Sequence, residues 1–114
     1  MNKSLVDECI EVAIDYCTYS IDIVENYKKT NKLFEKSHKL FLKLKSSAGG
    51  IEKLYELLNH EHIYVRYTAS IYLLNVDEKA ALDCIERLRG INRHLDFDIK
   101  YLLKEWKAGN LTIY

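Results

Sequence analysis

The sequence predicts an all-α protein in which about six helices form three antiparallel pairs, stacked as a short right-handed α-solenoid. Its 114 residues contain no proline and only four glycines, so few breaks interrupt the runs of helical apolar spacing. The segment 62–75 is apolar on two opposite sides of a helix, and such a helix is normally buried between neighbours. We therefore place 62–75 in the middle of the stack. At this length we expect a single domain over residues 1–114.

The first predicted helix spans about 4–27 and has a purely acidic strip. Ser4 is suited to cap its first turn, and two neighbouring apolar seams run along it. No Lys or Arg lies between Lys3 and Lys28, and the strip holds Asp7, Glu8, Glu11, Asp15, Asp22 and Glu25. Like charges one turn apart repel each other, so we expect groups outside the helix to balance them.

The second predicted helix, about 31–46, follows a polar turn at 28–31 and has a basic strip. Its outward lysines are Lys32, Lys36, Lys39 and Lys43. Residues 1–27 contain one basic and six acidic side chains, whereas residues 28–60 contain eight basic and three acidic ones. The net charge of zero therefore conceals a strong segregation. Two interpretations stay open: the lysines or simply water balance the acidic strip, or the acidic strip faces a basic partner.

Four shorter helices complete the prediction. They span about 50–58, 62–75, 77–89 and 93–108. The paired glycines at 49 and 50 allow the chain to reverse before the first of them. Asp77 is placed to cap the third, and Gly90 and Gly109 are typical residues just after a helix end.

The last four helices look like two copies of one unit. A shift of 30 residues aligns Leu58 with Leu88, Val65 with Leu95, Tyr67 with Phe97, Ala69 with Ile99 and Leu73 with Leu103. A repeat of this length with two helices per copy is typical of an α-solenoid, in which each pair covers the apolar face of the previous one.

The segment from Leu57 to Leu73 resembles a HEAT repeat, in which a leucine pair and a polar turn precede a Val-Arg in the second helix. Here these are Leu57-Leu58, Asn59-His60 and Val65-Arg66. Together with the Gly-Gly joint and the final Leu-Lys-Glu-Trp-Lys-Ala-Gly of 103–109, nearly the whole chain resembles a small bacterial HEAT-like family of unknown function. Some members of that family are immunity proteins of contact-dependent growth inhibition systems. The resemblance implies a protein that binds and blocks a cognate polymorphic toxin domain.

The motifs of several other functional classes are missing. We find no nucleophile motif and no phosphate-binding glycine loop, so we expect no enzyme, no catalytic residues and no cofactor. We also expect no metal site, because His60-Glu61-His62 lacks the spacing of a zinc motif and reads as a polar turn between helices.

The predicted location is the cytoplasm. The first residues lack the basic leader and apolar run of a signal peptide, and no apolar run approaches the roughly 20 residues that cross a bilayer. Cys9, Cys17 and Cys84 lie within apolar patterns and form no C-x-x-C motif, so we expect reduced, buried thiols. No membrane partner is predicted.

The predicted partner-binding residues are the acidic strip and two tyrosines at one edge of the central helix. They are Asp7, Glu8, Glu11, Asp15, Asp22, Tyr64 and Tyr67. Carboxylates would complement the basic substrate cleft of a nuclease toxin and speed association, and tyrosine suits half-buried interface positions. For the two tyrosines, packing in the core is the favoured alternative.

Two other functions stay open. One is a general HEAT-like protein-interaction module, or a homodimer through the face that carries the tyrosines, without a toxin partner. The other is a nucleic-acid binder that uses the lysines of the second helix, although these lack the arginines and interleaved aromatic rings of many such surfaces.

Overall fold

The computed structural model describes the backbone of residues 4–20 and 23–111, and the side chains of residues 4–16 and 32–111. This part of the chain contains no strand, and its six helices are α1 (Leu5–Ser20), α2 (Ile23–Ser46), α3 (Gly50–Leu57), α4 (Ile63–Leu73), α5 (Glu78–Arg87) and α6 (Arg93–Lys107). The radius of gyration, 13.6 Å, is close to the roughly 13 Å expected of a compact chain of this length. The prediction of an all-α protein is confirmed. Within the described residues, no helix is both long and apolar enough to cross a bilayer.

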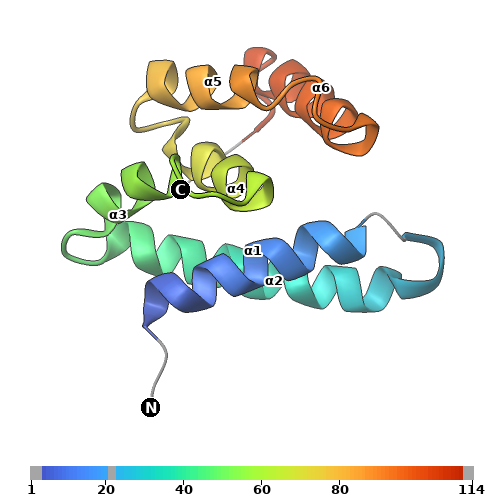
Figure 1. The fold of residues 1–114 in the computed structure, drawn as a ribbon, viewed down its shortest axis with the longest axis horizontal. Helices are drawn as coiled ribbons and strands as arrows, with labels where there is room; N and C mark the ends of the chain where they lie inside the picture. Colours follow the sequence, from blue (N-terminus) through green and yellow to red (C-terminus); the bar gives the residue numbers. More distant parts are fainter. Residues whose placement is uncertain (1–3, 21–22, 112–114) are drawn as a thin grey trace.

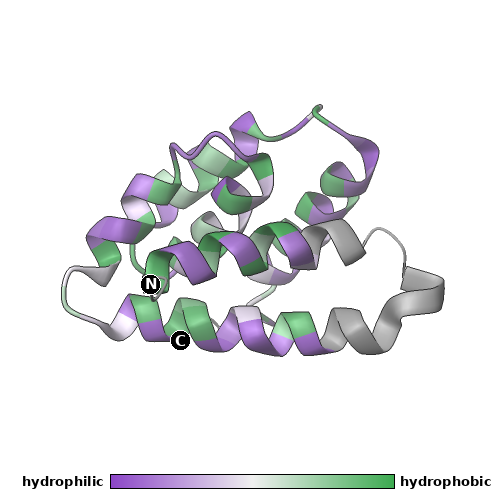
Figure 2. Ribbon diagram, turned by 60° about the horizontal axis from the view of Figure 1, so that its bottom comes forward, coloured by the Kyte–Doolittle hydropathy of each residue, from purple (hydrophilic) through white to green (hydrophobic). Residues whose placement is uncertain are grey.

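The helices are arranged with α4 in the middle. The long helices α1 and α2 lie side by side and antiparallel at one end of the molecule, and α5 and α6 lie at the other (Figure 1). Helix α4 contacts α1, α2 and α3 on one side and α5 on the other. Hydrophobic and hydrophilic residues alternate along α1 and along α2, as amphipathic helices require (Figure 2). The prediction of a central helix near 62–75 is confirmed.

The first two helices differ from the prediction. Helix α1 ends at Ser20 and α2 already begins at Ile23, so the expected polar turn at 28–31 is wrong and those residues belong to α2. The segment Lys28-Lys29-Thr30-Asn31 contains neither glycine nor proline, and lysine is a good helix former. Polarity alone therefore did not end the helix there.

The other helix ends agree with the prediction to within two residues, and side chains cap the starts of several of these helices. The Ser4 hydroxyl accepts a hydrogen bond from the Asp7 N–H at 3.1 Å, and Asp77 accepts one from the Ala80 N–H at 3.1 Å. Asn92 does the same for α6, accepting from the Leu95 N–H at 2.7 Å. Each of these bonds satisfies a donor that the first helical turn leaves unpaired.

Helix α4 is buried on nearly all sides. Val65, Ala69 and Leu73 are completely inaccessible to solvent. Thr68 and Ser70 are also buried, and their hydroxyls donate to the carbonyl oxygens of Tyr64 and Tyr67 at 2.8 and 2.6 Å. Both hydroxyls are thus satisfied within their own helix, which removes the cost of burying them.

Tyr72 joins α4 to α2. Its ring stacks on Phe41 with centroids 5.1 Å apart, and its hydroxyl lies 2.9 Å from Nδ1 of His38. Burial is the main cause that raises the pKa of Tyr72, with smaller contributions from Cys9 and Tyr16. The phenol therefore stays neutral and packs as part of the core.

A second bond links α3 to the start of α5. The Tyr55 hydroxyl donates to Oδ2 of Asp77 at 2.8 Å. The Ala80 N–H and this hydroxyl together hold the pKa of Asp77 below its ordinary value. One carboxylate therefore caps α5 and also ties it to the preceding helix pair.

The turn between α2 and α3 depends on Gly50, which is buried. A Cβ atom added there would lie 1.6 Å from the carbonyl oxygen of Leu44.

We predict that Gly50→Ala lowers the free energy of unfolding by about 3 kcal/mol, the upper end of the usual overpacking cost. The control is Gly90→Ala, because φ at Gly90 is 84° but an added Cβ meets nothing within 4 Å. There we expect the free energy of unfolding to fall by about 1–2 kcal/mol, the cost of left-handed backbone for alanine. Urea unfolding measures both, and equal losses would contradict the close contact.

Candidate functional site

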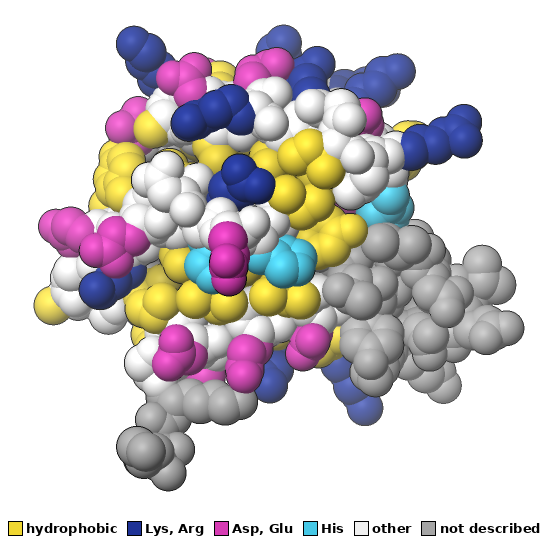
Figure 3. All heavy atoms as spheres, viewed as in Figure 1, with side chains coloured by type: hydrophobic (Ala, Val, Ile, Leu, Met, Phe, Trp, Pro, Cys, Tyr) yellow, Lys and Arg dark blue, Asp and Glu magenta, His cyan; other side chains and the backbone are white. Residues whose placement is uncertain are grey.

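The outer side of α1 carries an acidic surface, which we define as Asp7, Glu8, Glu11 and Asp15. All four side chains are exposed. Aspartates and glutamates gather along the lower edge of the molecule, where α1 lies (Figure 3). Asp22, the fifth predicted carboxylate, lies outside the described residues. The structure thus gathers on one exposed helix face all the predicted acidic residues that it describes.

Within the described residues, no ion pair neutralises Asp7, Glu8 or Asp15. The lysines predicted to balance them are Lys32, Lys36, Lys39 and Lys43. These four side chains are exposed on α2 and form no ion pair either. Of the two interpretations of the acidic strip, pairing with these lysines therefore does not apply to Asp7, Glu8 and Asp15.

The two predicted tyrosines have different environments. Tyr64 is half-buried at the start of α4, and its ring lies 5.3 Å from that of His62. Tyr67 is only 8% exposed and belongs to the core. The expectation that Tyr67 lies at an accessible edge is therefore wrong, because the apolar side of α4 that holds it is covered. Of these two predicted tyrosines, Tyr64 is the one that a partner could reach.

The His60-Glu61-His62 segment forms the turn between α3 and α4. Nδ1 of His60 accepts a hydrogen bond from the His62 N–H at 3.0 Å, and Nδ1 of His62 accepts one from the Tyr64 N–H at 3.2 Å. Both rings therefore stabilise the start of α4, which agrees with the prediction of a polar turn between these helices. Among the described residues, no group of three His, Cys, Asp or Glu side chains is arranged to hold a metal ion.

Histidine side chains lie above the carboxylates of α1, separated from them by a band of hydrophobic side chains (Figure 3). This face therefore combines an apolar strip with a charged rim. That composition is common in surfaces that bind proteins.

The two cysteines whose side chains are described lie in the core. Cys9 is inaccessible and Cys84 is 2% exposed, and neither forms a disulfide. Burial raises the pKa of both thiols, to about 12 for Cys9. Cys17 lies outside the described side chains. Because the thiolate is the reactive form, Cys9 and Cys84 are inert at neutral pH.

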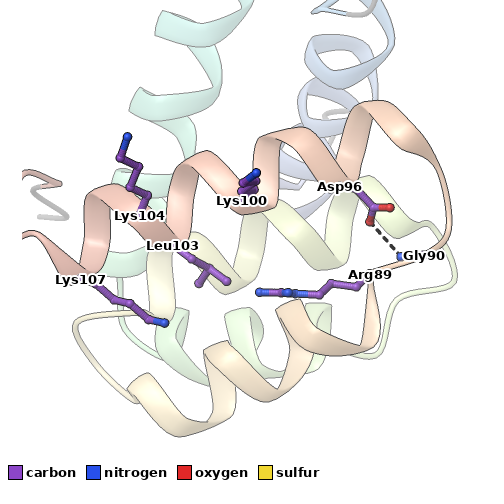
Figure 4. A pocket seen from close by; sticks show the side chains of 7 residues that line it. All are labelled: Arg89, Gly90, Asp96, Lys100, Leu103, Lys104 and Lys107. Carbon is purple, nitrogen blue, oxygen red and sulfur yellow. Dashed lines mark hydrogen bonds between the residues drawn. The ribbon is translucent and has the colours of Figure 1, made fainter.

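The sequence reasoning missed a basic groove between the end of α5 and α6. It has a volume of about 530 Å³ and is lined by Arg89, Gly90, Asp96, Lys100, Leu103, Lys104 and Lys107 (Figure 4). Its lining has four cationic side chains and one carboxylate. The signal in the sequence was the spacing of Lys100, Lys104 and Lys107, which places three lysines near one side of a helix.

Comparison of the chain with models of known protein families, with curated proteins and with solved structures finds no match.

The buried thiol of Cys9 makes the free energy of unfolding depend on pH in the alkaline range. Burial is the main cause of its raised pKa, from 9.0 to about 12, and Glu8 adds to it. The folded protein keeps a proton that the unfolded chain loses above pH 9. The contribution of Cys9 to stability is therefore complete below pH 9 and is lost as the pH rises toward 12. We predict a decrease of about 1.4 kcal/mol per pH unit from this group within that window.

The measurement is urea unfolding of the wild type and of Cys9→Ala from neutral to alkaline pH. Other titrating groups are the same in both proteins, so they cancel in the difference. The difference in unfolding free energy is expected to stay constant up to pH 9 and then to change with that slope. Parallel curves across the whole range would show that Cys9 is not protected from ionisation.

Proposed function

We propose that this chain is an immunity protein that binds a cognate toxin domain and blocks it by occlusion. The observation that carries the proposal is the acidic surface of α1, where Asp7, Glu8 and Asp15 are exposed and have no ion pair with any side chain that the structure describes. The resemblance of the sequence to a family that includes such proteins supports it. The toxin proposed is a polymorphic toxin of the contact-dependent growth inhibition type, and the proposed site of action is the cytoplasm.

Exposed like charges on one helix destabilise that helix slightly, and a basic partner surface would offset this cost. A nuclease domain offers such a surface, because its substrate cleft must attract phosphates. The acidic surface would then occupy the cleft in place of nucleic acid. Long-range attraction between the two surfaces would raise the association rate. We propose Tyr64 and the apolar band beside the carboxylates as the less polar part of the same interface.

We also infer that the three helix pairs form a short right-handed α-solenoid of the HEAT-like kind. Positions 30 residues apart support this inference. Val65 and Leu95 are both buried, and so are Ala69 and Ile99. Helix α4 contacts all three helices that precede it as well as α5, as the middle member of a stack would.

The first test uses the toxin domain encoded by the gene beside this one. We expect the tagged chain to co-purify with that domain when the two are co-expressed, and to restore growth of cells that produce it. A domain that neither co-purifies nor is neutralised would contradict the proposal.

The second test reverses two charges of the acidic surface. We predict that Glu8→Lys with Asp15→Lys weakens toxin binding at least about 100-fold, because opposing like charges at an interface cost several kcal/mol. The melting temperature should hardly change, since exposed charges contribute little to stability. The matched control is Glu78→Lys with Asp83→Lys, two exposed carboxylates of α5. Equal weakening by both pairs would mean that only the net charge matters.

A further inference from the structure

Two large aromatic side chains of α6 are unusually exposed. Phe97 is 70% exposed and Tyr101 is 62% exposed, the two highest values among the large hydrophobic residues of the described chain. Tyr67, the counterpart of Phe97 one repeat earlier, is only 8% exposed. No helix of the described chain covers Phe97, so α6 has an exposed aromatic face.

Cationic side chains are interleaved with these rings. Phe97, Lys100, Tyr101 and Lys104 are spaced three and four residues apart, which places them on one face of α6. Arg93, one turn before Phe97, extends the same face, and it is exposed like the two lysines. The two rings are separated by one turn, about 6 Å along the axis.

The basic groove adjoins this face and shares Lys100 and Lys104 with it. Arg89 reaches across the groove from the end of α5, and Lys107 enters it from the last turn of α6 (Figure 4). The one carboxylate of the lining, Asp96, accepts a hydrogen bond from the Gly90 N–H at 2.8 Å. This bond holds the Asp96 carboxylate at the turn between α5 and α6. Residues 87–107 contain six Lys and Arg against three Asp and Glu, so an anion would be attracted here.

The combination of rings and cations distinguishes between the classes of ligand. A second copy of this face would bring like charges together, which disfavours a symmetric dimer through it. A duplex would satisfy the cations but would leave the rings unused, because its bases are already stacked. Unpaired bases stack on exposed aromatic rings while their phosphates contact Lys and Arg, and this binding tolerates many sequences.

We propose that the exposed face of α6 and the adjoining basic groove bind single-stranded nucleic acid. Phe97 and Tyr101 stack against successive bases, and Lys100, Lys104 and the groove cations contact the phosphates. This site is separate from the lysines of α2, which lack interleaved rings, and from the acidic surface of α1. It does not depend on the proposed immunity function.

The test is fluorescence anisotropy with labelled 20-nucleotide oligo(dT) and oligo(U), and with a duplex of the same length, over a range of salt concentrations. We expect both single strands to bind more tightly than the duplex, with affinity that falls steeply as salt rises. A preference between oligo(dT) and oligo(U) would identify DNA or RNA as the ligand. Absence of binding by either strand at low salt would overturn the proposal.

Substitutions on α6 test whether the rings and lysines of this face form the binding site. Phe97→Ala and Tyr101→Ala are each expected to weaken binding at least about fivefold, since stacking contributes about 1–3 kcal/mol per base. Lys100→Ala with Lys104→Ala should lower the slope of log affinity against log salt by about 1.4, or 0.7 for each lost phosphate contact. All four side chains are exposed, and circular dichroism verifies that the fold is kept.

The matched control is Lys32→Ala with Lys36→Ala, which removes the same charge from α2. The control is expected to bind like the wild type. Equal weakening by both lysine pairs, or unchanged binding after loss of the rings, would overturn the proposal. So would a poly-glutamate peptide that competes as well as unlabelled oligo(dT), because it would identify an acidic protein as the better ligand.

Discussion

The burial of α4 on two sides is the constraint on which the rest of the structure depends. Val65, Ala69 and Leu73 have no exposed surface, and Tyr72 connects the helix to Phe41 and His38 of α2. Loss of this packing would uncover the apolar sides of α1 and α2 that face α4, and would remove the contact between α4 and α5. Few polar groups interrupt α4, and the hydroxyls of Thr68 and Ser70 are bonded within it. A helix of only 11 residues therefore holds two ends of the molecule together.

The acidic surface of α1 and the basic groove beside α6 lie at opposite ends of the molecule, although α2, which carries four exposed lysines, packs beside α1. Carboxylates gather on α1 at one end and cations on α6 at the other, so a chain with zero net charge presents two surfaces of opposite sign. Each surface also has apolar or aromatic groups beside its charges. The charges of a surface attract a partner of opposite charge over long distances, and the apolar groups provide contact area once the partner is bound. One small protein could thus bind two chemically opposite ligands, a basic protein surface on α1 and a single strand on α6.

The sequence was sufficient wherever structure is decided locally. The caps at Ser4 and Asp77 and the two-sided helix near 62–75 follow from residue type and spacing, and the structure confirms them. The turn expected at 28–31 failed because polar residues without glycine or proline are compatible with helix. Tyr67 and Phe97 occupy equivalent positions in the sequence repeat, yet one is buried and the other exposed. That difference depends on the tertiary packing around each position, and the basic groove likewise combines residues of the α5–α6 turn with residues of α6.

Native-state hydrogen exchange tests the central role of α4 most directly. If α4 holds both ends together, its amides should exchange only when the whole protein unfolds, with opening free energies equal to the global free energy of unfolding. The amides at the outer ends of α1 and α6 should open more readily. Exchange of the α4 amides by a local opening, while those of α1 and α2 stay protected, would contradict this account.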